Sequence, residues 1–183
     1  MLCDISGSMS DYSRMVLHFV HAVVNQRGQG WARVHAFTFG TRLTNITRSL
    51  RHRDPDVALL RADQQVHDWK GGTRIASCLD EFNHRWARRL LGANAALLLV
   101  TDGLDRDDAG ELSRAAAQLR RLAHQIVWLN PLLRYEGFEA RAAGVRALLP
   151  RVDRFLPVHN LASLADLGRA LRAPALRPAS LLH

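Results

Sequence analysis

The continuous apolar run Ala95–Val100 is the feature that most constrains the fold of this 183-residue chain. A strand that is apolar on both faces has to be covered on both sides, as in parallel sheets flanked by helices. Helical patterns flank it at Thr73–Leu91 and Asp107–Leu122, and a second apolar strand is predicted at Gln125–Asn130. This alternation predicts an α/β fold with a doubly wound, mostly parallel sheet and helices on both faces.

The rest of the chain extends this alternation at both ends. The other predicted elements are a short strand Met1–Cys3, a helix Tyr12–Asn25, strands Arg33–Phe39 and Arg42–Arg48, a helix from Pro55 to about Trp69, a helix Phe138–Leu148, a strand Val152–Val158 and a helix Ser163–Leu171. A turn at Gly40-Thr41 makes the second hairpin strand antiparallel, and its polar composition places it at a sheet edge. We expect one domain over residues 1–172, with a flexible tail over residues 173–183.

A candidate metal site is formed by hydroxyl and carboxylate side chains in three separate segments. Asp4, Ser6 and Ser8 follow the first strand, Thr73 precedes a helical pattern, and Asp102 follows the apolar strand. In open α/β sheets, ligands bind beyond the carboxyl ends of the strands, so Asp4 and Asp102 should meet there. Hard oxygen donors without Cys or His favour Mg²⁺ or Mn²⁺ over Zn²⁺ or Cu²⁺.

The same residues also have a purely structural interpretation. Asp4, Ser6 and Ser8 could cap the first helix, Asp102 could belong to a plain turn with Gly103, and Thr73 could begin a helix. The sequential order of the three segments favours the cation site, because each of the short motifs is common when it occurs alone.

The three motifs together resemble the metal-ion-dependent adhesion site of von Willebrand factor A (VWA) domains, and the chain is similar to CoxE-type VWA proteins. The matching stretches are Leu2–Met9, Val34–Thr44, Gly71–Ile75, Leu98–Gly103, Trp128–Leu132, Tyr135–Phe138 and Leu156–Asn160. The resemblance implies a VWA (Rossmann-like) fold and carries metal-binding roles to Asp4, Ser6, Ser8, Thr73 and Asp102.

The resemblance also implies a partner. CoxE-like proteins act with MoxR-type AAA+ ATPases in assembling or activating metalloenzymes, notably molybdenum hydroxylases of the carbon monoxide dehydrogenase type. We therefore expect a protein partner that supplies an acidic residue to the metal. CoxE-like chains usually carry a long segment before the VWA domain, whereas only three residues precede Asp4 here. The first strand is therefore expected to be truncated, with further natural sequence upstream of Met1.

Other functions are disfavoured by composition and motif. The net charge of +8 comes mostly from arginines dispersed over several helices without interleaved aromatics, so nucleic-acid binding is not expected. Only Cys3 and Cys78 are present, and we expect buried reduced thiols in a cytoplasmic protein without a membrane span. The alternative is a Mg²⁺-dependent phosphatase-like hydrolase that uses Asp4 as nucleophile. Such chemistry resembles the haloacid dehalogenase pattern, which has a second acid two residues after the first. Ser6 stands at that position, so no general acid lies beside the nucleophile and we expect no enzymatic activity.

Overall fold

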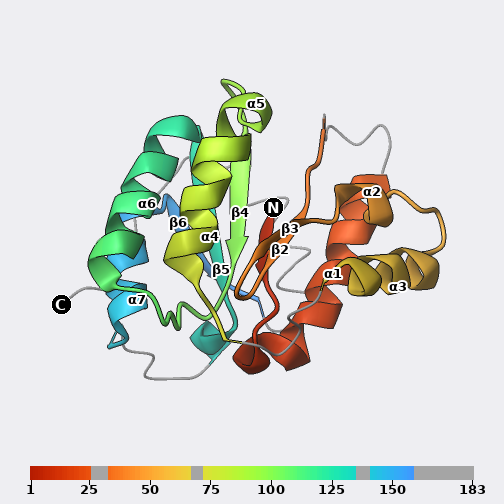
Figure 1. The fold of residues 1–183 in the computed structure, drawn as a ribbon, viewed down its shortest axis with the longest axis horizontal. Coiled ribbons are helices and arrows are strands. Elements are labelled where there is room, and N and C mark those ends of the chain that lie inside the picture. The colour runs from red at the N-terminus through yellow and green to blue at the C-terminus, as the bar shows by residue number, and fades with distance from the viewer. Residues whose placement is uncertain (26–32, 67–71, 135–140, 159–183) are drawn as a thin grey trace.

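The protein is built on a six-stranded sheet with the strand order β3-β2-β1-β4-β5-β6 (Figure 1). A computed structural model describes residues 1–25, 33–66, 72–134 and 141–158. The strands are β1 (Leu2–Asp4), β2 (Phe37–Phe39), β3 (Leu43–Asn45), β4 (Ala96–Val100), β5 (Gln125–Asn130) and β6 (Arg154–Pro157). All neighbouring pairs are parallel except β2 and β3, which are antiparallel. The mostly parallel sheet and its antiparallel edge strand are thus confirmed.

The winding of the sheet reverses between β1 and β4, which lie side by side at its centre. Leu2 and Cys3 of β1 pair with Leu99 and Val100 of β4. The chain moves outward through β2 and β3 on one side and through β5 and β6 on the other. The carboxyl ends of β1 and β4 therefore open onto the same crevice, which is where ligands bind in folds of this type.

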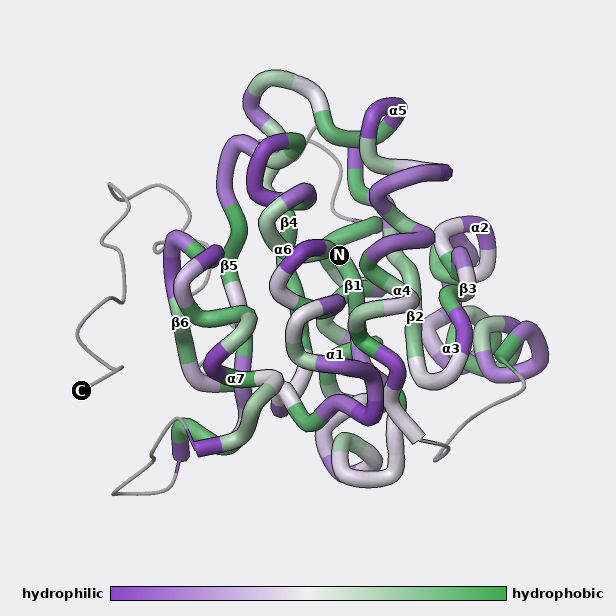
Figure 2. The backbone as a smooth tube through the Cα atoms, turned by 60° about the vertical axis from the view of Figure 1, so that its left-hand side comes forward, coloured by the Kyte–Doolittle hydropathy of each residue, from purple (hydrophilic) through white to green (hydrophobic). Residues whose placement is uncertain are grey.

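Helices cover both faces of the sheet, and the sheet separates two hydrophobic cores (Figure 1). One face carries α1 (Ser10–Asn25), α2 (Thr47–Leu50) and α3 (Pro55–Gln65). The other carries α4 (Ile75–Phe82), α6 (Ala109–Leu122) and α7 (Ala143–Leu148). Alternate residues of β4 enter the two cores, Leu97 and Leu99 on the α4 side and Leu98 and Val100 on the α1 side. Figure 2 shows hydrophobic strands inside and hydrophilic stretches on the helices around them.

Both cysteines are buried and neither forms a disulfide, as the sequence predicted. Cys3 belongs to the core under α1, whereas Cys78 belongs to the core under α4. The sheet therefore separates the two thiols.

The two hairpin strands are shorter in the structure than the sequence predicted. The ladder holds only three residues of each strand, and the chain turns into α2 where Arg42–Arg48 was expected to continue as a strand. The Asn45 side chain accepts a hydrogen bond from the Thr47 backbone N–H at 3.0 Å, which closes a turn that ends the strand. The Thr47 hydroxyl in turn accepts from Ala36 N–H at 3.0 Å, next to β2.

The helix predicted over Thr73–Leu91 begins later and is not uniform. It starts at Ile75, widens into a π-helical segment at Asn83–Ala87, and ends in the short α5 (Arg88–Leu90). Asn83 in this segment is buried and its side-chain amide donates to the Ala115 carbonyl of α6 at 2.9 Å. The predicted end of the helix at Trp69, the start of that at Phe138, the helix Ser163–Leu171 and the tail 173–183 lie outside the described residues.

Short helical turns complete the described chain. They are η1 (Gly7–Met9), η3 (Pro131–Arg134) and η4 (Leu149–Arg151), of which η1 and η3 directly follow the site-facing ends of β1 and β5. No helix of the described residues has the length and apolar character needed to cross a membrane.

Candidate functional site

Asp4 and Asp102 lie at the exits of β1 and β4, and Thr101, between β4 and Asp102, binds the Asp4 carboxylate. Asp4 is the last residue of β1, and Asp102 follows β4 by two positions. The Thr101 hydroxyl donates to Asp4 Oδ2 at 2.7 Å and accepts from Gly103 N–H at 3.0 Å. Asp4 is 1% exposed and Asp102 is 2% exposed. Two acids from segments almost 100 residues apart are thus buried near each other at the strand exits.

Ser6 and Ser8 belong to the same cluster. The Ser6 backbone N–H donates to Asp4 Oδ1 at 2.8 Å, which folds the chain back over the end of β1. The Ser6 and Ser8 hydroxyl oxygens are 3.2 Å apart, with Ser6 buried and Ser8 exposed. The Ser6 side chain makes no capping hydrogen bond to the helical turn that follows. The capping interpretation therefore leaves the Ser6 hydroxyl unexplained, while an oxygen cluster at the strand exit accounts for it.

The third segment contributes Thr73. It is 5% exposed and lies in an extended stretch before α4. The Arg106 backbone N–H donates to the Thr73 carbonyl at 3.1 Å, and the next residue, Arg74, donates its N–H to the Gly40 carbonyl at 2.9 Å. Since Gly40 follows β2 and Arg106 follows β4, Thr73 is held between the loops of the two strands that flank β1.

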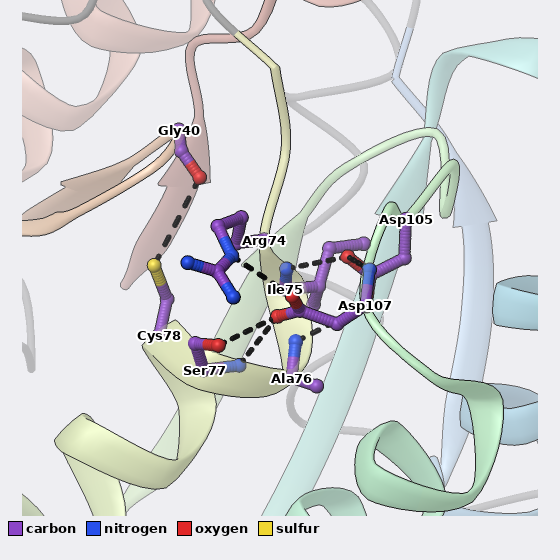
Figure 3. A network of polar contacts seen from close by, with 8 residues as sticks. All are labelled: Gly40, Arg74, Ile75, Ala76, Ser77, Cys78, Asp105 and Asp107. Atoms are coloured by element: carbon purple, nitrogen blue, oxygen red, sulfur yellow. Dashed lines mark hydrogen bonds and ion pairs between the residues drawn. The ribbon is translucent and has the colours of Figure 1, made fainter.

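Two carboxylates of the loop after β4 fasten the start of α4 to that loop (Figure 3). Asp105 accepts from the backbone N–H groups of Ile75 at 2.8 Å and Ala76 at 3.1 Å. Asp107 accepts from the Ser77 N–H at 2.9 Å and from the Ser77 hydroxyl at 2.7 Å, and pairs with Arg74 Nε at 2.9 Å. Arg74, at the N-cap position, provides no side-chain cap, so the loop supplies it.

Asp105 and Asp107, together with their partners at the start of α4, are called the latch below. Hydrogen bonding within the latch determines the pKa of Asp107. Burial alone would raise the pKa of Asp107, but the hydrogen bonds from Ser77 and the Arg74 guanidinium outweigh it, so the pKa is held below its usual value. From the sequence, either Asp107 or Asp108 could cap the next helix. The structure gives that role to Asp108, which accepts from Gly110 N–H at 2.9 Å and Glu111 N–H at 3.1 Å.

Residues of β5 support the Asp102 loop from the other side. The Asn130 amide donates to the Asp102 carbonyl at 3.0 Å, and Trp128 Nε1 donates to the Thr101 carbonyl at 2.8 Å. In the loop that these bonds support, Gly103 adopts a φ of +81°, and a Cβ there would lie 2.9 Å from both Trp128 and Val145. Only glycine combines that backbone conformation with the contact. Asn130 and Thr101 both stand at strand exits, and the sequence marks Thr101 as the residue between the apolar strand and Asp102.

The electrostatics of the two buried acids favour a bound cation. The pKa of Asp4 is raised to about 6, mainly by burial and also by the charge of Asp102, while hydrogen bonds from Thr101 and Ser6 oppose the shift. Among the described residues, the ion pairs involve neither Asp4 nor Asp102. Two buried, neighbouring carboxylates without a cationic side chain are costly, and a divalent cation would offset that cost.

The donor set fits a hard divalent cation. Asp4 and Asp102 offer carboxylate oxygens, and Ser6, Ser8 and Thr73 offer hydroxyl oxygens. In the described part of the chain, no three His, Cys, Asp or Glu side chains gather as a metal-binding group, so hydroxyls must supply a large share of any shell here. Mg²⁺ and Mn²⁺ accept such oxygen-only shells.

Comparisons with known proteins agree with this architecture. A family model described as "VWA domain containing CoxE-like protein" matches residues 1–164. No curated protein sequence matches the chain. Among solved structures, a von Willebrand factor type A protein from Catenulispora acidiphila is similar with a TM-score of 0.65 and 17% identity, over 93% of this chain and 40% of that one.

Two further structures are similar at low sequence identity. The proximal thread matrix protein 1 of mussel byssus, described with a zinc-occupied MIDAS motif, has a TM-score of 0.58 and 16% identity, over 93% of this chain and 45% of that one. BatB from Bacteroides thetaiotaomicron has a TM-score of 0.61 and 14% identity, over 94% of this chain and 97% of that one. This chain thus spans less than half of the first two proteins, and the likeness concerns the fold.

Proposed function

Because this chain belongs to the family of VWA domain containing CoxE-like proteins, we propose that it is a protein-binding module that acts through a divalent cation. The ion, Mg²⁺ or Mn²⁺, is held by Asp4, Ser6, Ser8, Thr73 and Asp102. The observation that carries the proposal is the pair of buried carboxylates at the central strand exits, surrounded by hydroxyl oxygens.

The chain's own residues define what such a site can do. Few charged ligands leave a bound ion able to attract a further carboxylate, which a protein partner supplies as Asp or Glu. Thr101 and the Ser6 backbone N–H orient Asp4, while Leu104 N–H donates to Asp102 Oδ1 at 2.9 Å and orients Asp102. Such contacts to the carboxylate oxygens of the ligands are of the kind that fix metal-binding geometry.

The partner we propose is a MoxR-type AAA+ ATPase or its client metalloenzyme, such as a molybdenum hydroxylase, and the setting is the cytoplasm. This part rests on family membership. A catalytic role is not proposed, because Ser6 stands where a phosphatase-like mechanism would need its second acid. Turnover of generic phosphate esters that survives purification and is lost in Asp4→Asn would contradict this.

The proposal is tested by capture of the ATPase or its client in EDTA and in Mg²⁺. We expect capture only with Mg²⁺, and weaker capture by Thr73→Ala, which removes a neutral ligand without leaving a buried charge unpaired. The matched control is Thr44→Ala on the edge strand β3, which should capture normally. Equal capture by all three proteins, with and without EDTA, would place the interface away from the metal.

A further inference from the structure

The surface beside the candidate metal site carries an exposed apolar side chain and an exposed guanidinium on the same loop. Leu104 is 47% exposed and is one of two large hydrophobic side chains that are exposed in the described residues. Its backbone N–H donates to Asp102 Oδ1, so Leu104 lies in the loop next to a proposed metal ligand. Arg106, two residues further, is also exposed.

The Arg106 guanidinium lies against Gly72, the residue before Thr73. A Cβ at Gly72 would lie 2.6 Å from Arg106 Cζ and Nη1, so it would displace the guanidinium, which is the far end of a flexible side chain. The Arg106 backbone is bonded to the Thr73 carbonyl at the same place. The absence of a side chain at Gly72 therefore creates a position for the guanidinium beside a proposed metal ligand.

Arg106 places a positive charge on the surface beside the site. Two carboxylates balance a divalent cation, and the charge of Arg106 then remains. Asp105 and Asp107, the acids on either side of Arg106, are engaged with the start of α4. The ion pairs of the described residues do not include Arg106. The N–H donors of its exposed guanidinium are thus able to bind a carboxylate in bidentate geometry.

We propose that Leu104 and Arg106 extend the metal site into a docking surface for an acidic protein segment with two carboxylates. One carboxylate goes to the metal, the second pairs with Arg106, and an apolar side chain of the segment packs on Leu104. This proposal rests on the proposed function, and it adds the requirement for a second acid. A single acid identifies a generic partner, whereas two acids at a fixed spacing with an apolar residue make recognition selective.

The test uses synthetic peptides as probes, because the natural segment is unidentified. One peptide carries a single Glu among Gly and Ser, a second set carries two Glu separated by one, two or three residues, and a third adds Leu next to the pair. Affinity is measured by NMR titration of the labelled domain in Mg²⁺ and in EDTA. In Mg²⁺, the best two-Glu peptide should bind about three- to tenfold more tightly than the single-Glu peptide, the range of one charge-assisted contact at a surface.

Three variants assign that gain to the proposed residues. Arg106→Gln should abolish the advantage of the second Glu, and Gly72→Ala should reduce it by displacing the guanidinium while Arg106 stays intact. Leu104→Ser should abolish only the gain from Leu. The control is Arg121→Gln in the last turn of α6, which removes an exposed arginine at the end of the helix remote from the site.

Each outcome separates this inference from the proposed function. A two-Glu advantage that is lost in Arg106→Gln and kept in Arg121→Gln supports the docking surface. Mg²⁺-dependent binding of the single-Glu peptide without a two-Glu advantage, or with equal losses in both arginine variants, overturns the docking surface and leaves the metal function standing. Failure of every peptide to bind a domain shown to hold Mg²⁺ overturns both.

Discussion

Removing Asp105 should weaken metal binding far more than its effect on stability explains. Asp105→Ala deletes two hydrogen bonds to the start of α4, at 2.8 and 3.1 Å. Loss of a cap of this type costs about 1–2 kcal/mol, or about 2–8 °C in Tm for a chain of this size. Because the latch also fixes Thr73 relative to Asp102, we expect the Kd for Mg²⁺ to rise about tenfold or more, as for other losses of support around metal ligands.

Asp108→Ala is the matched control for this prediction. Asp108 lies in the same loop and accepts two backbone N–H groups at 2.9 and 3.1 Å, but these belong to α6. The Tm should fall by a similar amount, whereas the Kd for Mg²⁺ should change by less than about threefold. Calorimetric titration with Mg²⁺ and thermal unfolding of both variants give the four numbers. Equal changes in Kd for the two variants would refute the positioning role of the latch.

Three further predictions follow from the geometry of the crevice. Because burial raises the pKa of Asp4 to about 6, protons compete with the metal below that pH. Mg²⁺ should therefore bind about tenfold more weakly at pH 5 than at pH 7.5. A Kd that does not vary between these pH values would show that Asp4 is not a ligand. The same pKa shift affects stability in the absence of metal, because the folded state binds the Asp4 proton more tightly than the unfolded state. The free energy of unfolding should therefore decrease by roughly 3 kcal/mol as pH rises from about 4 to about 6. Denaturant titration at several pH values measures this change. Gly103→Ala should lose about 1–3 kcal/mol, because its φ is +81° and the new Cβ would meet Trp128 and Val145; an unchanged Tm would contradict it.

The sequence predicted the centre of the fold better than its margins. The apolar run of β4 and the helical faces on either side determine the sheet type, because a strand buried on both sides has few alternative structures. The hairpin was over-extended, since alternation over Arg42–Arg48 could not reveal the turn that the Asn45 side chain forms with Thr47. Long-range ladders decide where a strand ends, and composition alone does not contain them.

The candidate site was predictable in part for the same reason. Strand exits in a parallel sheet converge, so Asp4 and Asp102 could be placed together without knowledge of any contact. The latch could not, because Asp105 and Asp107 bind backbone and side-chain groups about 30 residues away. The Arg106 guanidinium beside Gly72 was equally hidden, since glycine in a loop indicates a close approach but not the group that approaches.

The most direct test of the metal site is the stoichiometry of Mn²⁺ binding, measured by electron paramagnetic resonance on the protein and on Asp102→Asn. The asparagine retains an acceptor for the Leu104 N–H, so the loop keeps its support while one carboxylate charge is lost. We expect one Mn²⁺ per chain, displaced by Mg²⁺, and at least tenfold weaker binding in the variant. Absence of a bound ion at millimolar Mn²⁺, or the same affinity in both proteins, would contradict a metal site between Asp4 and Asp102.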